Sequence, residues 1–246
     1  TTSGVGKKIN QQISYWQNFG NDVRLFMHTY DYQPVSELLN GSMFRYRRIP
    51  GFAGKLVTEI FRILAANKML RGIREYNPDI IYLRMGMYTF PLHHICKLAP
   101  LVSEINTNDV KQHRLLGKAL STYNQLTRSI LLTRSRGLVF VSSELSSTRE
   151  YSRFKKPSLV LSNGYDLDEV PQLPPPNNEI PHLVFIGSPD CPWHGVEKLV
   201  PFARSHQNIV VDIIGYDHIY NETQIPKNLI LHGYLKRQDY QIILGE

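Results

Sequence analysis

Residues 182–195 combine an apolar run, glycines and histidines in an order that suits the binding of an anion. The run from Leu183 to Ile186 predicts a buried strand, Gly187 ends it, and Gly195 leads into an amphipathic stretch that predicts a helix. Such a strand–loop–helix unit directs backbone N–H groups and the positive end of the helix dipole toward the end of the strand. We therefore expect this loop to bind an anionic group.

Glycines recur where the expected strands meet the expected helices. Gly187, Gly215 and Gly233 each follow an apolar run in the second half of the chain. Near the start, Ser3-Gly4-Val5-Gly6 precedes an amphipathic helix, and we expect the strand that belongs before this helix to lie outside the sequence. Ligands of open α/β sheets bind at the carboxyl ends of strands, where glycine lets the backbone approach a phosphate closely. Simple turns are the alternative interpretation, which the residues alone leave open.

Polar residues after apolar runs mark a second candidate site in the first half of the chain. Arg84 and Glu104 each stand at the end of such a run, and Asn106 and Asp109 come shortly after the second one. All four could line a ligand cleft at the carboxyl ends of neighbouring strands. The alternatives are a strand-end salt bridge for Arg84 and a cap or turn role for Asn106 and Asp109.

Apolar runs that alternate with amphipathic stretches predict an α/β protein with parallel, doubly wound sheets. In the first half we expect strands at 23–27, 80–83, 101–105, 138–141 and 158–161, and helices around 9–16, 54–76, 111–134 and 143–150. In the second half we expect strands at 183–186, 209–214 and 228–231, and helices at about 195–205 and 236–244. Each half therefore has the order of elements of a doubly wound α/β domain.

A proline-rich segment separates the two halves. Residues 171–181 carry prolines on both sides of a short polar tract, which favours a stiff, extended linker. We expect one domain at 1–170 and a second, incomplete one at 182–246.

The net charge changes sign at the same place. Residues 1–176 hold 23 Lys and Arg against 13 Asp and Glu, a net charge of +10, whereas residues 177–246 hold 5 against 8, a net charge of −3. Basic side chains concentrate at Arg45, Arg47, Arg48 and Lys55, at Arg128, Arg134 and Arg136, and at Arg149, Arg153, Lys155 and Lys156. Such a surface could meet anionic lipid headgroups, a phosphorylated acceptor or nucleic acid, or could simply be solvated. The basic residues are not interleaved with aromatics in a recognisable module, so we expect no nucleic-acid partner.

Several function classes are excluded by missing motifs. The sequence has no Gly-x-x-x-x-Gly-Lys-Ser/Thr loop, no Gly-x-Ser-x-Gly elbow and no Gly-x-Gly-x-x-Gly dinucleotide fingerprint.

No apolar run approaches the ~20 residues that span a bilayer. The two cysteines, Cys96 and Cys191, lie far apart, as in proteins of a reducing compartment, so we expect a cytoplasmic protein. We expect no metal site.

Four segments together resemble a known enzyme family. They are Ser3-Gly4-Val5-Gly6, Leu138-Val139-Phe140-Val141-Ser142-Ser143, Ser162-Asn163-Gly164-Tyr165-Asp166 and Leu183 to Gly195. In this order, and with 228–234 as a later strand, they resemble retaining glycosyltransferases of the GT-B architecture, of the family 4 type. The resemblance implies two Rossmann-like domains, the second incomplete here, in a chain truncated at both ends.

The resemblance also implies a ligand and a set of contacts. In that family a nucleotide-diphosphate sugar, such as a UDP- or GDP-sugar, binds mainly to the second domain and the acceptor mainly to the first, without a cofactor and usually without metal. The residues at the matching positions or strand ends, which we expect to bind the donor, are Gly4, Gly6, Gly187, Ser188, His194, Gly215, Gly233 and Tyr234. Arg84, Glu104, Asn106 and Asp109 would line the acceptor side.

The chain departs from the family pattern at three places. Ser188 stands where the family commonly has Arg, and His194 stands where it has Lys, so two fixed cations are replaced. The Glu-x7-Glu motif of the family would follow Glu246, so the catalytic residues are unknown and we expect the chain alone to be inactive.

The expected function is transfer of a sugar to a glycan or lipid-linked acceptor with retention, in bacterial surface-polysaccharide biosynthesis. The basic first domain suggests peripheral contact with an anionic membrane surface, on its inner face. A non-catalytic module that binds nucleotide sugars or glycans is the alternative.

Overall fold

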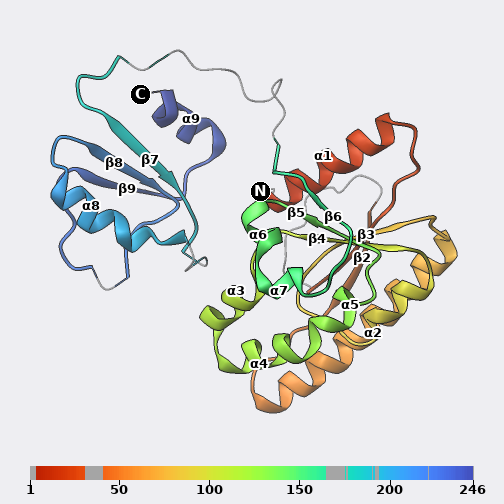
Figure 1. The fold of residues 1–246 in the computed structure, drawn as a ribbon. Helices are drawn as coiled ribbons and strands as arrows, with labels where there is room; N and C mark the ends of the chain where they lie inside the picture. The colour runs from red at the N-terminus through yellow and green to blue at the C-terminus, as the bar shows by residue number, and fades with distance from the viewer. Residues whose placement is uncertain are drawn as a thin grey trace. The chain divides into compact units, whose positions relative to one another are not determined.

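The computed structural model describes residues 4–30, 41–164, 175, 177–189, 191, 194–220 and 222–245, and the structural statements below concern these residues (Figure 1). The chain forms two compact units, unit 1 at Thr1–Gly164 and unit 2 at Tyr165–Glu246, and each is considered by itself. Part of the expected linker, and Tyr165 and Asp166 of the third resemblance segment, lie outside the described residues.

Unit 1 contains parallel strands in two sheets. One sheet pairs β1 with β2, and the other has the order β3-β4-β5-β6. The strands are β1 (Leu25–Tyr30), β2 (Gly41–Tyr46), β3 (Ile81–Arg84), β4 (Leu101–Ile105), β5 (Gly137–Phe140) and β6 (Ser158–Val160). All but β2 lie within two or three residues of the expected strands. Strand β2, in which exposed and half-buried residues alternate, was not predicted from the sequence.

Helices lie on both faces of the larger sheet. They are α1 (Gly4–Asn18), α2 (Phe52–Tyr76), α3 (Asp109–Leu116), α4 (Lys118–Thr127), α5 (Ser129–Leu132), α6 (Ser143–Ser147) and α7 (Arg149–Ser152), with a 3₁₀ helix, η1 (Leu92–Lys97). Trp16 of α1 packs edge-on against Tyr82, whereas Ile81 and Leu83 join the core cluster that contains α2. Because neighbouring side chains of a strand point to opposite faces, α1 and α2 cover opposite faces of β3. The expected α/β class with parallel sheets is confirmed.

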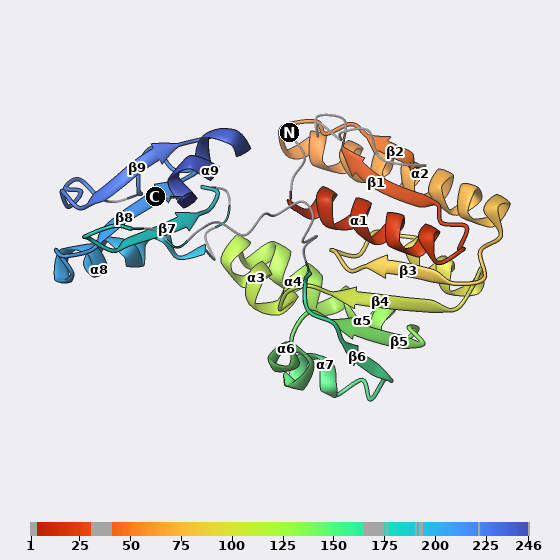
Figure 2. The same ribbon diagram turned by 90° about the horizontal axis from the view of Figure 1, so that it is seen from above.

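A cavity of about 900 Å³ lies between β1 and β3. Its lining includes Ile13 of α1, Phe26 of β1, Met69 of α2 and Leu83 of β3. Figure 2 shows the strands in the order β2, β1, β3, β4, β5, β6, with α1 crossing over the space between β1 and β3. Among the described residues, β1 and β3 each pair with a strand on one side only. The strand expected before α1 stays a prediction, and this cavity is where such a strand would pair with both edges.

The prediction of one continuous helix at 111–134 is wrong. The structure has three shorter helices instead, α3, α4 and α5. The first break falls at Gly117, whose φ of 122° lies in a region that side chains rarely adopt. The helix expected after Ser142 is likewise split into α6 and α7, although Ser142 caps α6 by accepting a hydrogen bond from the Leu145 N–H.

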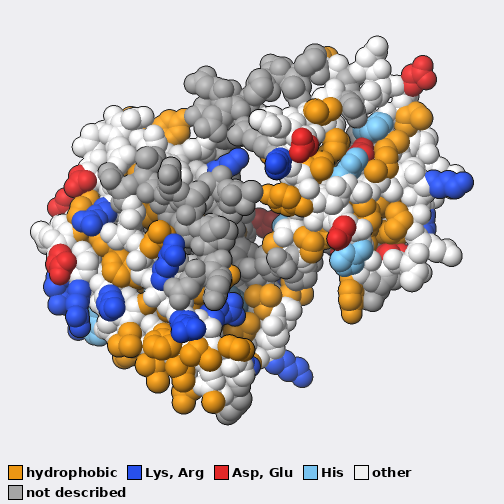
Figure 3. Space-filling model, turned by 180° about the vertical axis from the view of Figure 1, so that it is seen from behind, with side chains coloured by type: hydrophobic (Ala, Val, Ile, Leu, Met, Phe, Trp, Pro, Cys, Tyr) orange, Lys and Arg blue, Asp and Glu red, His pale blue; other side chains and the backbone are white. Residues whose placement is uncertain are grey.

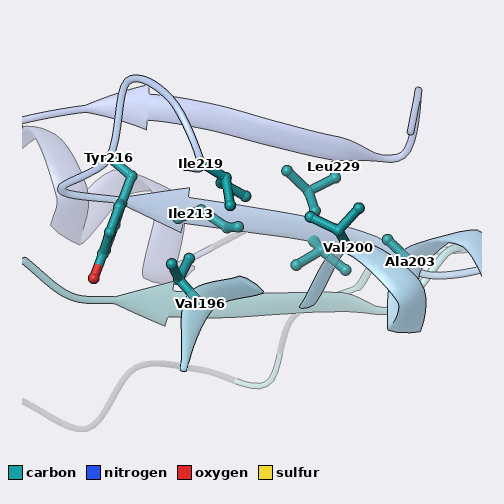
Figure 4. Close-up of a cluster of buried hydrophobic side chains, with 8 residues drawn as sticks. Val196, Val200, Ala203, Ile213, Tyr216, Ile219 and Leu229 are labelled. Carbon is teal, nitrogen blue, oxygen red and sulfur yellow. The ribbon is translucent and has the colours of Figure 1, made fainter. Parts of the chain in front are cut away.

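Unit 2 has one parallel sheet with the order β7-β8-β9. Its elements are β7 (His182–Ile186), η3 (Val196–Lys198), α8 (Leu199–Ser205), β8 (Val210–Ile214), β9 (Leu229–Gly233) and α9 (Arg237–Gly245). One sheet face packs on η3 and α8 through a cluster of buried apolar side chains, shown in Figure 4. The cluster consists of Val196, Val200, Ala203, Val211, Ile213, Tyr216, Ile219 and Leu229. This packing fixes η3 and α8 against one face of the sheet.

Candidate functional sites

The carboxyl ends of the three strands of unit 2 are tied together through glycines. The Gly187 N–H donates to the Ile214 carbonyl at 3.0 Å, and the Gly215 N–H donates to the Gly233 carbonyl at 2.6 Å. The Gly233 N–H in turn donates to the Tyr216 carbonyl at 2.9 Å. The structure thus brings together three of the residues that we expected to bind a donor.

Two of these glycines are required by packing. A Cβ atom on Gly215 would lie 2.1 Å from the Gly187 carbonyl oxygen, and Gly215 has a φ of 96°. A Cβ on Gly187 would lie 2.7 Å from the ring of Phe185 and 2.8 Å from the ring of Tyr216. Close contact between chain segments therefore explains both glycines. At Gly233, with a φ of 64°, no atom lies within 4 Å of the Cβ position, so backbone conformation alone favours glycine.

The loop after β7 folds back on itself. The Ser188 carbonyl accepts hydrogen bonds from the Cys191 N–H at 3.0 Å and from the Tyr216 hydroxyl at 2.6 Å. The His194 N–H donates to the Cys191 carbonyl at 2.9 Å. Asp190, Pro192 and Trp193 lie outside the described residues. The described backbone of the loop after β7 is thus held close to the carboxyl edge of the sheet, where Gly187, Gly215 and Gly233 lie.

His194 is held in one tautomer by this loop. The Ser188 N–H lies 3.3 Å from Nδ1 of His194, so Nδ1 must be the acceptor. The ring proton of His194 in this hydrogen-bonding arrangement is therefore on Nε2.

Lys198 supplies a cation that was not predicted from the sequence. The position of a Cβ on Gly195 would lie 3.8 Å from Nζ of Lys198, so the ammonium group lies over the end of the loop. The expected helix at 195–205 begins as the 3₁₀ turn η3, and only the seven residues of α8 are α-helical. In the sequence, Lys198 follows Gly195 by three residues, which places both on one turn of a 3₁₀ helix. This spacing could have predicted that the two residues lie together. Glu197 is also exposed on this turn.

A carboxylate flanked by two histidines lies on the sheet of unit 2. Asp212 is 3% exposed, and its two oxygens contact Nδ1 of His182 at 2.9 Å and Nε2 of His232 at 2.7 Å. Asp212 and His232 belong to neighbouring strands, on the side opposite the buried apolar cluster. No local sequence pattern connects these residues, because 30 positions separate His182 from Asp212.

In unit 1, three of the expected acceptor-side residues meet around Lys8 of α1. Lys8 Nζ contacts Oε1 of Glu104 at 2.5 Å and donates to Oδ1 of Asn106 at 3.1 Å. Arg84 is the register partner of Glu104 on the neighbouring strand, and their nearest charged atoms lie 3.8 Å apart. Glu104 is only 3% exposed, so two cations flank a buried carboxylate. Lys8 was not anticipated, because its contacts are about a hundred positions away in sequence.

This group contains donors that have no hydrogen-bond partner in the described structure. They are Nη1 of Arg84 and Nδ2 of Asn106, and both atoms are buried. A buried donor without a partner costs about 1–3 kcal/mol, so a carbonyl, hydroxyl or anionic oxygen bound here would relieve that cost. Nearby, burial first and the Glu104 charge second raise the pKa of Tyr82 to about 12. The four residues Lys8, Arg84, Glu104 and Asn106 are called the Lys8 cluster below.

Gly4 and Gly6 lie within the first turn of α1 and not in a loop before it. Ser3, which precedes them, lies outside the described residues. Because Lys8 of the next turn contacts Glu104 and Asn106, the amino end of α1 lies beside the carboxyl end of β4. The two glycines are therefore placed near the Lys8 cluster, at the expected edge of the sheet.

Asp109 belongs to a different group and has a structural role. Its carboxylate accepts hydrogen bonds from Arg128 at 2.7 and 2.8 Å, from Tyr151 at 2.6 Å and from Asn124 at 2.7 Å. Burial alone would raise the pKa of Asp109, but these hydrogen bonds outweigh it and lower the pKa. Arg128 is buried in this contact, so it forms no part of the basic surface to which we assigned it. The cap of α3 is Asn108, not Asn106 or Asp109.

A comparison with models of known protein families finds no match, and no curated protein matches the chain. In the described ranges, no helix has both the length and the apolar character to cross a membrane. In the same ranges, no three His, Cys, Asp or Glu side chains come together as a group that could hold a metal ion. The sites are therefore interpreted from their own geometry.

Proposed function

We propose that the protein is a glycosyltransferase that takes a sugar from a nucleotide-diphosphate donor, and that unit 2 binds the donor. The observation that carries this proposal is the carboxyl edge of the β7–β9 sheet. There Gly187, Gly215 and Gly233 are linked by the backbone, and the loop that bears Ser188 and His194 lies beside them. Open α/β sheets bind nucleotides at this edge.

Lys198 and His194 give this edge its expected affinity for a diphosphate. The Lys198 ammonium lies over Gly195, and the His194 ring belongs to the same loop. In a glycosyl transfer the leaving diphosphate gains negative charge, and donors already aimed at it lower the barrier. We assign the nucleotide base to Gly233 and to Tyr234, which is 74% exposed just after β9.

Unit 1 would hold the acceptor at the Lys8 cluster. The buried donors on Arg84 and Asn106 suit a hydroxyl or phosphate oxygen of a glycan or lipid-linked acceptor. Glu104 could accept a hydrogen bond from an acceptor hydroxyl, because its carboxylate lies within the same cluster. The chemistry of sugar transfer, with retention, is part of the proposal.

Calorimetric titration of the chain with UDP, GDP and ADP tests donor binding. We expect one nucleotide to bind, and Lys198→Ala to weaken its binding about tenfold, because charge-assisted hydrogen bonds contribute about 1.5–3 kcal/mol each. Lys227→Ala is the matched control, since Lys227 is also an exposed lysine of unit 2. The proposal fails if none of the three nucleotides binds.

A non-catalytic module that binds the same nucleotide sugar is the second candidate. The replacement of two expected cations by Ser188 and His194 favours it. A panel of nucleotide sugars, incubated with the full-length gene product, separates the two functions. Release or transfer of the sugar supports the enzyme, whereas binding without either supports the module.

A further inference from the structure

The amino-terminal half of α2 exposes a stripe of large apolar side chains. Leu56, Val57, Ile60 and Leu64 are 70%, 37%, 51% and 52% exposed. Their spacing of three and four residues places them along one side of the helix, over about 12 Å from Leu56 to Leu64 at 1.5 Å per residue. We call these four residues the α2 stripe.

The opposite side of this part of the helix packs inward through small residues. Gly54, Ala65 and Ala66 are buried there. Large apolar side chains that lie along one side of a helix are normally covered, by protein or by lipid. The α2 stripe is not covered by any described part of the chain, and contiguous exposed apolar surface of this kind marks an interaction site.

Helix α4 exposes apolar side chains as well, and it meets α2 on the side away from the α2 stripe. The Tyr123 hydroxyl of α4 and Nη2 of Arg62 of α2 both donate to the Tyr88 carbonyl, at 2.9 and 3.0 Å, so the two helices meet there. On α4, Leu120 and Leu126 are 39% and 73% exposed. Figure 3 shows hydrophobic side chains gathered over this part of unit 1, with Lys and Arg side chains close by.

Along α2 the apolar stripe continues into a basic one. Lys68, Arg71 and Arg74 follow Leu64 at intervals of four, three and three residues, and all three are exposed. They therefore lie on the same side of the helix as the α2 stripe.

The acidic side chains of α2 do not interrupt the apolar part of this side. Glu59 lies to one flank and is paired with Arg62 at 3.1 Å. Glu75 follows Arg71 by four residues and Lys68 by seven, so it lies on the basic part of the same side, near the end of the helix. This side of α2 thus offers apolar side chains and then three cations with one carboxylate.

We propose that this face of α2 binds the surface of an anionic lipid bilayer, with the helix axis parallel to the bilayer plane. The α2 stripe would enter the boundary between headgroups and acyl chains, and Lys68, Arg71 and Arg74 would contact lipid phosphates. The charge argues for lipid over a second protein, because residues 1–176 have a net charge of +10 and the anionic leaflet attracts such a surface. This inference does not depend on the proposed sugar transfer.

Co-sedimentation with vesicles tests the apolar part of the proposal. We expect the chain to bind vesicles of phosphatidylcholine with about 30 mol% phosphatidylglycerol, and to bind pure phosphatidylcholine much more weakly. The double variant Leu56→Asp/Ile60→Asp should lower the partition coefficient about 100-fold, about tenfold for each apolar side chain withdrawn. Ile242→Asp is the matched control, because Ile242 is a 64% exposed apolar residue on α9 of unit 2.

The basic part is tested with Lys68→Gln/Arg71→Gln. We expect this variant to lose most of its preference for the anionic vesicles and to lose its sensitivity to salt, since each cation near the surface contributes about fivefold to binding. Lys227→Gln/Lys236→Gln, which removes two exposed lysines of unit 2, should bind as the unchanged chain does. Circular dichroism and the thermal midpoint verify that each variant is folded.

Either of two results would overturn the proposal. One is equal binding of the unchanged chain and the Leu56→Asp/Ile60→Asp variant to the anionic vesicles. The other is an oligomer of the unchanged chain in solution that the same variant converts to monomer, with no vesicle binding in either form. The second result would assign the α2 stripe to a contact between copies of the chain.

Discussion

At the scale of residues, one buried ion pair accounts for Asp109, which resembled a site residue in the sequence, and for Arg128, which was assigned to the basic surface. Arg128 is buried, binds Asp109 through two nitrogens and stacks on Tyr151, with its guanidinium carbon 5.0 Å from the ring centre. Burial of this kind costs free energy unless each charge keeps its partner. The group joins α3, α4 and α7, so its role is to hold helices together.

We expect Arg128→Ala to lower the free energy of unfolding by about 3–5 kcal/mol, because it leaves the Asp109 carboxylate buried without its partner. Arg136→Ala, at an exposed arginine of the same unit, should change it by less than about 0.5 kcal/mol. Urea denaturation measures both. The double variant Asp109→Asn/Arg128→Met should recover much of the loss, since no unpaired charge is left. A loss of under 1 kcal/mol in Arg128→Ala would contradict this account.

The same pair gives a pH dependence of known sign. The pKa of Asp109 is lower in the folded chain than its ordinary value of 3.8, because its hydrogen bonds outweigh burial. The stabilisation is therefore complete above pH 3.8 and is lost as the pH falls toward the lowered pKa. The free energy of unfolding of Asp109→Asn, measured as the pH falls below 3.8, should lack this loss of stabilisation.

Single residues also show what the sequence could and could not predict about the sites. Gly187, Gly215 and Gly233 were found because each ends an apolar run, and strand ends of a parallel sheet meet at one edge. Lys8 and Lys198 were missed, because a lysine carries no signal of which distant or neighbouring group its flexible side chain will contact. Local pattern reveals the edge of a sheet, whereas side-chain contacts across the fold depend on packing.

At the scale of elements, apolar runs predicted strands well and helix lengths less well. β4 has the expected bounds of 101–105, because a short apolar run between turn residues fits little else. The prediction of one helix at 111–134 was wrong because the apolar periodicity of the sequence continues past Gly117. At that residue the backbone takes a positive φ and the helix is interrupted. A helix tolerates an interior glycine at a cost of about 1 kcal/mol, so a break there is decided by tertiary packing.

Hydrogen exchange can test the open edges of β1 and β3 directly. The Ile81 N–H donates to the Pro100 carbonyl and the Met85 N–H to the Glu104 carbonyl, so in this parallel pairing the intervening Tyr82 and Arg84 N–H groups point away from β4. They point toward the side of the cavity between β1 and β3. We expect the Tyr82 amide to exchange much faster than the Ile81 and Leu83 amides, because no strand pairs with it in the described structure. Equal protection of all three would mean that another segment occupies the cavity.

At the scale of the whole molecule, the two units carry separate cores and opposite net charges. The core of unit 2 is one cluster around Val200 and Ile213, whereas the cores of unit 1 lie around Ile95 and around Leu132. The proline-rich linker and the change of charge predicted a division into two halves, and the structure divides the chain between Gly164 and Tyr165. The positions of site residues within each unit follow from its own sheet. The GT-B arrangement of the two units stays a proposal.

Separate cores imply that damage to one unit leaves the other intact. Ile213 and Leu132 are both 0% exposed, one in each unit, so replacing either by alanine should cost about 2–5 kcal/mol in that unit. In Ile213→Ala we expect faster hydrogen exchange throughout β7, β8 and β9 and unchanged exchange in β4 and β5. Leu132→Ala should give the reverse pattern, which makes each variant the control for the other. If either variant instead raised exchange in both units alike, the chain would unfold as a single cooperative body and the donor and acceptor sites could not be varied independently.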